Sequence, residues 1–384
     1  MSEMVRLGDV FNISSGGTPN KKHSEYYEGG TIPWIKTGDL KEMYISNHVE
    51  YITQLGLENS SAKIFPINTV LVAMYGATIG ACSILPFEAA TNQACAAFLP
   101  SETIIPNYLY YFLCSKKDQF VKDGVGGAQP NISAAYLKNV EIQIPSLNRQ
   151  KFIISVLDKV SKLIALRKRQ LDLLDEMVKA RFVEMFGDPV RNEKGWDQLP
   201  LIQACKAIFG GGTPSKSHPE YYNGNTPWVT PKDMKRTLIT DSIDHITDDA
   251  IKNSTTNLVP QNSVLMVIRS GILKHTLPVA INIIPVTINQ DMKAFITDEL
   301  ISPIFLMYYF KSIESDVLSG VRGVTADNID FKTFQRSLIP IPPIELQNQF
   351  ADFVQQVEKS KATVQQGLDR LNLLKSALMQ EYFG

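Results

Sequence analysis

Residues 16–19 of the chain read Gly-Gly-Thr-Pro, and the same four residues stand at positions 211–214. The identity extends well beyond this motif, because Lys21, His23, Glu25, Tyr26 and Tyr27 return as Lys216, His218, Glu220, Tyr221 and Tyr222. Further on, Pro33, Trp34 and Asp39 return as Pro227, Trp228 and Asp233. More than half of the aligned positions in this stretch are identical, which indicates an internal duplication.

The match continues more weakly to the end of each copy. Asn92-Gln93 aligns with Asn289-Gln290, Ile144-Pro145 with Ile341-Pro342, and Phe186-Gly187 with Phe383-Gly384. The repeated unit is therefore nearly 200 residues long, too long for one turn of a solenoid. We interpret each copy as a whole domain followed by a tail.

The first part of each copy mixes short β-rich runs with helical stretches. The runs 69–74 and 263–268 are punctuated by Gly, Pro and Asn, as strands are, whereas residues 108–115 and 304–311 favour helices. This pattern predicts an α+β domain that is rich in loops.

The second part of each copy has apolar residues at alternating steps of four and three, which is typical of a coiled-coil seam. Residues 148–186 and 345–383 contain no proline and a single glycine, Gly367. A helix of this length would be roughly 58 Å long and needs a partner for its apolar stripe. The predicted helix-pairing residues are Ile153, Leu157, Val160, Ile164, Leu171, Leu174 and Val178, with Phe350, Val354, Val357, Val364, Leu368, Leu371 and Leu378.

The two stripes are the obvious partners for each other, as an antiparallel coiled coil with pseudo-two-fold symmetry. Charged residues interrupt both seams, and each aligns with an apolar residue of the other copy: Arg167 with Val364, Arg181 with Leu378, Lys361 with Ile164 and Lys375 with Val178. These charges either snorkel at the edge of the seam or face further subunits. The alternative is that each helix only covers the core of its own domain. The predicted division is 1–147 and 188–342 for the two domains, with 148–187 and 343–384 for the two helices.

Composition sets wider limits on function. The chain has 384 residues, 44% hydrophobic and 20% charged, with a net charge of −1. It lacks an apolar run long enough to span a membrane and a signal-peptide pattern, so we expect a cytoplasmic protein without membrane contact. The four cysteines form no CxxC pair, and we expect free thiols.

The chain resembles the specificity subunit of type I restriction–modification enzymes over its whole length. The resemblance rests on the paired GGTP…EYY…PW…D openings, on residues 126–133 (GGAQPNIS), and on residues 341–347 (IPPIELQ) before a long helix. The first copy departs from the IPPIELQ pattern at residues 146–150, and the second copy departs from the GGAQPNIS pattern at residues 322–328. The resemblance implies two target-recognition domains that each read one half of a bipartite site in double-stranded DNA. It also implies helices that set the spacing and dock two methyltransferase subunits, with a translocase–endonuclease restriction subunit completing the complex.

The resemblance further implies a non-catalytic chain without a cofactor of its own, since S-adenosylmethionine, ATP and Mg²⁺ would bind the partner subunits. Neither a phosphate-binding loop, nor an amino-methyltransferase motif, nor a nucleophile elbow, nor metal-ligand spacing is present in the sequence. Two rival hypotheses remain at this point, which are a duplicated scaffold that binds only proteins and an enzyme such as a metal-dependent nuclease.

Base edges are read by Arg, Lys, Asn, Gln, Ser and Thr on loops or helix starts. In the first copy the candidate DNA-binding residues are Lys21, His23, Lys36, Thr37, Tyr75, Thr78, Asn92, Gln93, Gln129 and Asn131. In the second they are Lys216, His218, Thr230, Lys232, Arg269, Ser270, Lys274, Asn289, Gln290, Arg322 and Asn328.

Several candidates have a structural interpretation beside the functional one. Arg269 is a candidate for a bidentate guanine contact or for a surface salt bridge. His23 and His218 favour a structural role, because the same residues occur in both copies whereas specificity should differ. Gly16–Pro19 and Trp34 are predicted to be turn and core for the same reason. The Asn-Gln pairs fit either a buried amide network or adenine contacts.

The openings of the two copies are nearly identical, whereas their middles differ. Residues 74–80 (MYGATIG) correspond to residues 268–274 (IRSGILK). We therefore expect a shared scaffold with two different reading surfaces, and hence an asymmetric target. Because the net charge is nearly neutral, binding by the chain alone should be weak and strongly salt-sensitive.

Overall fold

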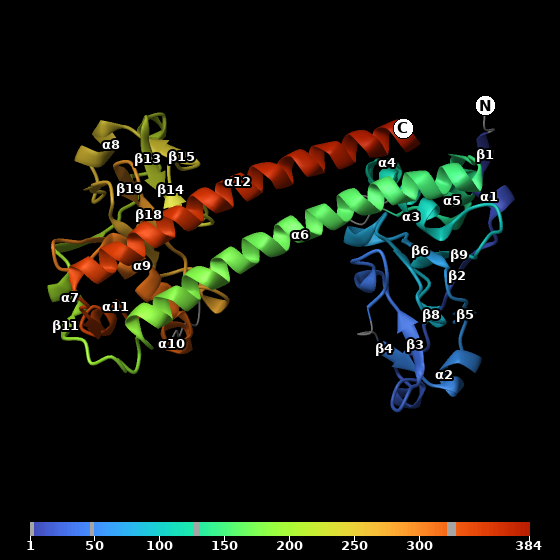
Figure 1. The fold of residues 1–384 in the computed structure, drawn as a ribbon, viewed down its shortest axis with the longest axis horizontal. Helices are drawn as coiled ribbons and strands as arrows, with labels where there is room; N and C mark the ends of the chain where they lie inside the picture. Colours follow the sequence, from blue (N-terminus) through green and yellow to red (C-terminus); the bar gives the residue numbers. More distant parts are fainter. Residues whose placement is uncertain (1–3, 47–49, 126–130, 321–327) are drawn as a thin grey trace. The chain divides into compact units, whose positions relative to one another are not determined.

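The computed structural model describes residues 4–46, 50–125, 131–320 and 328–384, which divide into two compact units. The first unit comprises residues 1–168 and 366–384, and the second comprises residues 169–365. Each unit therefore holds one globular domain and one part of each of the two long helices, α6 (Leu147–Phe186) and α12 (Ile344–Phe383) (Figure 1).

The globular domain of the first unit is built from two four-stranded sheets. One sheet has the order β2 (Ile13–Ser15), β9 (Cys95–Phe98), β6 (Val70–Ala73) and β7 (Cys82–Ile84), all antiparallel. The other has the order β4 (Glu50–Ile52), β3 (Ile32–Ile35), β8 (Ala89–Thr91) and β5 (Ile64–Phe65), in which β3 and β8 run parallel. A short pair, β1 (Met4–Arg6) and β10 (Glu141–Gln143), stands apart.

The first of these sheets is buried on both faces, which explains its continuously apolar strands. Val70 and Val72 of β6 join the core that contains α3 (Pro106–Ser115), whereas Leu71 and Ala73 face Ile35 of the second sheet. The remaining helices of this unit are α1 (Leu7–Val10), α2 (Gln54–Glu58), α4 (Lys117–Asp123) and α5 (Ala134–Asn139), with short 3-10 turns η1 (Ser24–Tyr26), η2 (Thr37–Asp39) and η3 (Gly76–Thr78). In Figure 1, α3 and α5 lie beside α6, and β3, β4 and α2 lie farthest from it.

The second unit repeats this architecture with one additional strand, as the duplication predicts. Its first sheet is β12 (Ala207–Gly210), β20 (Met292–Ile296), β17 (Val264–Val267), β18 (Val279–Asn282) and β14 (Leu238–Ile239). Its second is β15 (Asp244–Ile246), β13 (Thr226–Val229), β19 (Val286–Ile288) and β16 (Leu258–Val259), and its separate pair is β11 (Gln198–Pro200) with β21 (Leu338–Pro340). Its helices and turns are α7 (Leu201–Ala204), α8 (Asp248–Lys252), α9 (Pro303–Ser312), α10 (Glu314–Ser319), α11 (Phe331–Phe334), η4 (Pro219–Tyr222) and η5 (Gly271–Lys274). The extra strand β14 occupies the place of a single parallel bridge, Tyr44 to Ile84, in the first unit.

The two long helices pack together in antiparallel fashion within each unit. In the first unit, Ile153 and Leu157 near the start of α6 share a core with Phe383 at the end of α12. In the second, Phe182 near the end of α6 lies 5.4 Å from Phe350 near the start of α12, measured between ring centroids. All fourteen predicted pairing residues are buried or half-buried.

The seam is shared with the domain cores rather than confined to the helices. Phe182 and Phe186 of α6 also pack on Phe305 of α9, at ring-centroid distances of 5.6 and 4.8 Å. The helices therefore pair with each other and also cover the core of the neighbouring domain. An interpretation that gives them only one of these roles is too narrow.

The interrupting charges of the seam lie at its edge and contact aromatic rings or carboxylates. Arg181 stands 5.8 Å from the ring centroid of Phe353, and Lys375 stands 5.9 Å from that of Tyr111. Lys361 donates to Asp175 and Glu358 at 2.8 and 3.0 Å. Burial opposes the charge of Lys361, but these hydrogen bonds outweigh it and raise its pKa. This geometry supports the snorkelling interpretation.

A buried glutamine fastens the start of each long helix to its own domain. Gln150 accepts from the Ile105 amide at 2.9 Å and donates to the carbonyls of Thr103 and Pro145 at 2.8 and 2.9 Å. Gln347 accepts from the Ser302 amide at 2.8 Å and donates to Leu300 and Pro342 at 3.0 and 2.8 Å. Both side chains are fully buried, so the same set of hydrogen bonds fixes the start of α6 and the start of α12.

Candidate nucleic-acid interface

A ladder of backbone hydrogen bonds brings four loops of the first domain side by side. The Asn92 amide donates to the Ile35 carbonyl at 2.9 Å, the Met74 amide donates to Ala94 at 2.8 Å, and the Ile132 amide donates to Met74 at 3.0 Å. The loops that begin at Lys36, Asn92 and Tyr75 and the segment around Asn131 therefore form one continuous edge. We call this edge the first loop ladder.

The second domain builds the same ladder from different residues. The Asn289 amide donates to Val229 at 3.0 Å, the Ile268 amide to Asp291 at 2.8 Å, and the Ile329 amide to Ile268 at 2.9 Å. Isolated β-bridges close both ladders at their ends, from Tyr75 to Asn131 in the first and from Arg269 to Asn328 in the second. We call this edge the second loop ladder.

The segments that are nearly identical in the two copies, residues 16–39 and 211–233, pack beside these ladders. Trp34 and Trp228 are buried, and their indole N–H groups donate to Gly17 and Gly212 at 3.0 and 3.1 Å. A Cβ at Gly16 would stand 2.0 Å from the Thr91 carbonyl oxygen, so only glycine permits this approach. The prediction that Trp34 belongs to the core is confirmed, whereas residues 16–19 form an irregular, largely buried segment without an assigned turn.

An aspartate shapes the turn at the start of each ladder. The Asp39 carboxylate accepts from the Lys36 amide at 2.7 Å, and Asp233 accepts from the Thr230 amide and hydroxyl at 2.8 and 2.9 Å. Thr230 is consequently buried, whereas Lys232 two residues later is exposed. Both aspartates stand in the aligned openings, but the sequence alone shows no role for them.

In each Asn-Gln pair, the asparagine is buried or half-buried and the glutamine is exposed. Asn289 is buried, its side chain donates to Asp291 at 3.2 Å, and its oxygen accepts from the Asp291 amide at 3.1 Å. Asn92 is half-buried and accepts from the Ala94 amide at 3.2 Å. Gln93 and Gln290 are exposed and accept from the hydroxyls of Thr18 and Thr213. The asparagines thus favour the amide network, and the glutamines lie on the surface.

The two ladders present different side chains at matching positions. Tyr75 is exposed and precedes η3, with the Thr78 hydroxyl donating to its carbonyl at 3.2 Å. Arg269 takes the corresponding place in the second domain, precedes η5, and pairs with Asp291 at 2.6 Å. Ser270 accepts from the Ile272 amide at 3.4 Å, while Lys274 and Asn328 are exposed. Sequence reasoning missed Asp291, because Ala94 stands at the aligned position of the first copy.

The exposed cations of the openings lie on a neighbouring loop in each domain. His23 bonds Glu25 at 2.9 Å and stacks on Tyr26, and His218 bonds Glu220 at 2.8 Å and stacks on Tyr221. Backbone hydrogen bonding, followed by the histidine, lowers the pKa of both glutamates. Lys21 and Lys216 are exposed nearby, and Lys36 pairs with Glu50. Thr37 is half-buried in η2. The candidates Gln129 and Arg322 lie outside the described residues.

In the part of the chain that the structure describes, no three His, Cys, Asp or Glu side chains are grouped so that they could hold a metal ion. No helix among the described residues is both long and apolar enough to cross a membrane. The cysteines of the described chain are free thiols, as expected.

The fold and its two loop ladders define a duplicated recognition protein, with one scaffold carrying two different surfaces. The family model for the type I restriction modification DNA specificity domain matches residues 1–176 and again residues 193–373. The chain therefore belongs to the family of type I restriction–modification specificity subunits, and it contains two recognition domains.

Relatives and solved structures agree with this assignment. The chain is 29% identical to the type I restriction enzyme EcoR124I/EcoR124II specificity subunit of Escherichia coli, over 96% of this chain and 89% of that protein. It is 27% identical to the MjaIX specificity subunit of Methanocaldococcus jannaschii, over 98% and 91%. The fold matches a chain of a solved type I restriction–modification complex with a TM-score of 0.64, at 18% identity and with 99% and 97% covered. It matches the S subunit of M. genitalium with a TM-score of 0.56, at 14% identity and with 100% and 96% covered.

Proposed function

We propose that this specificity subunit reads an asymmetric, two-part sequence in double-stranded DNA, with one loop ladder on each half. The observation that carries the proposal is the pair of equivalent ladders with unlike residues at matching places, Tyr75 with Ala94 and Arg269 with Asp291. An identical scaffold places each reading edge in the same way, and different side chains select different bases.

Within a ladder, the side chains divide between base reading and backbone contact. Tyr75, Gln93 and Asn131 in the first domain, and Arg269, Gln290 and Asn328 in the second, are exposed at the edge and would meet base edges. Lys21, His23, Lys216 and His218 lie on a loop that is alike in both domains, so they fit sequence-independent phosphate contacts.

The paired helices would hold the two halves at a fixed spacing and dock two methyltransferase subunits, with a restriction subunit completing the complex. The exposed apolar residues of α6 and α12 support this proposal, because Leu166, Leu173 and Leu373 face away from the seam. The chain itself would perform no catalysis, and S-adenosylmethionine, ATP and Mg²⁺ would act in the partner subunits.

A domain replacement tests the asymmetric reading. Residues 198–342 are exchanged for a second copy of residues 4–145, so that both ends of the chain carry the first ladder. Modified-base sequencing of DNA from cells with the whole system should then show two identical half-sites in inverted orientation. The unaltered chain should give two unlike halves around a fixed unspecified spacer. A contiguous motif for the unaltered chain, or a motif that the exchange leaves unchanged, would contradict the proposal.

A further inference from the structure

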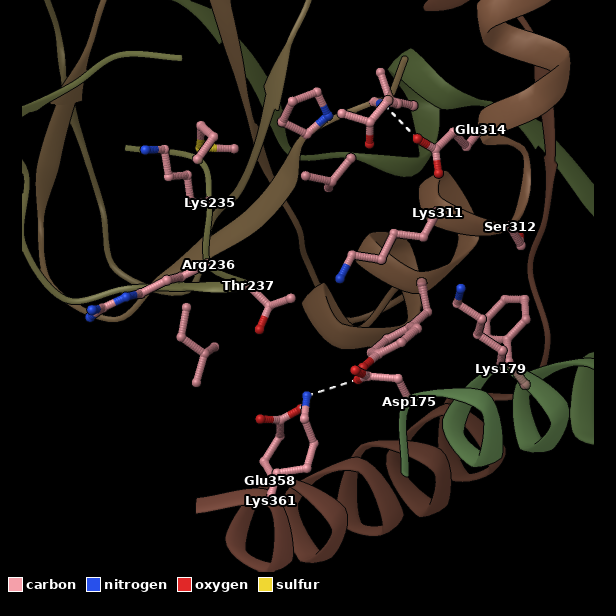
Figure 2. Close-up of a pocket in the computed structure, with 18 of the residues that line it drawn as sticks. Asp175, Lys179, Lys235, Arg236, Thr237, Lys311, Ser312, Glu314, Glu358 and Lys361 are labelled. Atoms are coloured by element: carbon pink, nitrogen blue, oxygen red, sulfur yellow. Dashed lines mark hydrogen bonds and ion pairs between the residues drawn. The ribbon is translucent and has the colours of Figure 1, made fainter. Parts of the chain in front are cut away.

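The second unit contains a large cleft that the loop ladders do not use. Its volume is about 1020 Å³, and residues of α6, α9, α12 and the 234–238 and 276–279 segments line it. A cavity of this size accommodates a ligand of nucleotide dimensions. In Figure 2, the side chain of Lys311 extends from α9 into the space between Thr237 and the two long helices.

Lys311 is half-buried and, among the described residues, has no carboxylate within ion-pair distance. Its ammonium group lies 5.1 Å from the ring centroid of Tyr308, and burial, followed by the nearby Lys361, lowers its pKa to about 8. Among the described residues, none forms an ion pair with Lys311. An ammonium group that is withdrawn from water without a counter-ion is costly, so its position favours the arrival of an anion.

The carboxylates that line the cleft are already engaged. Asp175 and Glu358 both accept from Lys361, at 2.8 and 3.0 Å. Glu314 accepts from the Leu277 amide at 2.6 Å, which fixes the rim of the cleft. Five cations line the same cleft, which are Lys179, Lys235, Arg236, Lys311 and Lys361, and in Figure 2 Lys235 and Arg236 extend away from Lys311. The lining therefore carries a surplus of positive charge.

The lining of the cleft also includes apolar and aromatic side chains. Leu277, Val279 and Phe182 contribute side chains to it, and the Tyr308 ring lies beneath the Lys311 ammonium. A bare inorganic ion would leave these apolar side chains uncovered. The combination fits a molecule with a polyanionic end and a flat or apolar body.

The first domain lacks this arrangement, so the scaffold does not require it. Residues 106–115 (PNYLYYFLCS) of α3 correspond to residues 303–312 (PIFLMYYFKS) of α9, which places Cys114 where Lys311 stands. The Tyr111 hydroxyl, at the place of Tyr308, donates to Asp158 at 2.6 Å. Among the described residues, the helix lysine at this position is thus found in the second domain, whereas in the first unit Lys375 of α12 lies 5.9 Å from the Tyr111 ring centroid instead.

We propose that this cleft binds a small organic polyphosphate, with its phosphates on Lys311 and Lys179 and its body against Leu277 and Val279. Such a ligand would supply the missing counter-charge at the junction of α9 with both long helices. Its binding would tie the second recognition domain to α6 and α12 in the same unit.

Calorimetric titration of the full chain tests this site, with magnesium-free ATP and inorganic tripolyphosphate as probes. ATP should bind once per chain, tripolyphosphate should compete with it, and Lys311→Met should weaken ATP at least tenfold. Lys179→Gln should weaken it less. Lys252→Met, at the exposed end of α8, is the matched control and should leave the affinity unchanged.

The pH dependence gives an independent readout. ATP should bind more weakly at pH 9.5 than at pH 7, because Lys311 loses its charge, and Lys311→Met should abolish most of this difference. The other charged and titratable groups that line the cleft are Lys179 and Asp175 on α6, Tyr308 on α9, Glu314 on α10, Glu358 and Lys361 on α12, and Lys235 and Arg236.

Three outcomes would overturn the proposal. They are no binding of either probe at millimolar concentration, equal affinity for the unaltered chain and Lys311→Met, and displacement of ATP by duplex DNA. The last result would make the cleft part of the DNA surface.

Discussion

The Nε atom of Arg269 lies 2.6 Å from a carboxylate oxygen of Asp291, although the two residues are 22 positions apart in the chain. The backbone carbonyl of Asp291 also accepts from the Ile268 and Arg269 amides at 2.8 and 3.2 Å. One residue therefore holds both the backbone and the side chain of Arg269. The guanidinium keeps its other nitrogens for a ligand, which is the arrangement that bidentate guanine recognition requires.

Arg269→Ala should reduce discrimination at one position of the half-site that the second domain reads. A bidentate contact to guanine is worth about 1–3 kcal/mol, so the preference for the matched base should fall roughly 5- to 150-fold. The measurement is binding of the complex with its methyltransferase subunits to duplexes with single base-pair changes in each half. Tyr75→Ala is the mirror control and should alter only the other half, so equal effects on both halves would refute the assignment.

Asp291→Ala tests a positioning role for the carboxylate. Discrimination should fall at the same position as in Arg269→Ala but less steeply, and Asp291→Asn should recover part of it. Stability should fall by about 1–3 kcal/mol in Asp291→Ala, because the half-buried carboxylate also accepts from the buried Asn289 side chain. In an Arg269→Ala background, Asp291→Ala should add nothing. An undiminished further loss of discrimination there would show that Asp291 acts apart from Arg269.

The duplication, the domain order and the long helices could all be predicted from the sequence. Identical letters reveal a repeat directly, and the spacing of residues such as Leu157, Val160 and Ile164 follows from the helical period. A pair such as Arg269 with Asp291 could not be predicted from the sequence, because it depends on which strands are neighbours in the sheet. The register of β17 against β20 aligns Val267 with Met292 and so brings these two residues together.

The burial of the aligned glutamines also could not be predicted from the sequence. Gln150 and Gln347 are visible in the sequence as a matched pair, but glutamine at a helix start is usually exposed. Their burial depends on three backbone groups that only the folded chain gathers. The cleft around Lys311 is equally hidden in the sequence, since its cations come from α6, α9, α12 and a loop.

Gln347→Leu should destabilise the second unit by about 3 kcal/mol or more. The change leaves the Ser302 amide and the Leu300 and Pro342 carbonyls unpaired in a buried place, at roughly 1–3 kcal/mol each. Urea unfolding measures this change. Gln355→Leu, at an exposed position of the same helix, should stay within about 0.5 kcal/mol. Equal midpoints for the two variants would show that the buried amide is dispensable.

Lys311→Met should stabilise the chain at pH 7. The pKa of Lys311 falls from 10.5 to about 8 on folding, so the unfolded chain holds more protons between these values. The cost of burying the charge is therefore complete below pH 8 and disappears as the pH rises past 10.5. We expect a gain of about 1–3 kcal/mol at pH 7 and a much smaller one above pH 10. Urea unfolding at both pH values, with Lys252→Met as control, measures it, and a loss of stability at pH 7 would contradict the burial of this charge.

Lys216→Gln should weaken DNA binding by a similar factor on every sequence, since the loop that carries Lys216 is alike in both domains and fits phosphate contact. The slope of log affinity against log salt should become shallower by about one, because one phosphate fewer is neutralised. The isolated chain should bind weakly at physiological salt, and its methyltransferase partners should raise the affinity greatly. Binding titrations at several salt concentrations, with and without partners, measure both quantities. Nanomolar affinity of the isolated chain at physiological salt would contradict the expected dependence on the partners. An effect of Lys216→Gln on one base position only would contradict a phosphate contact.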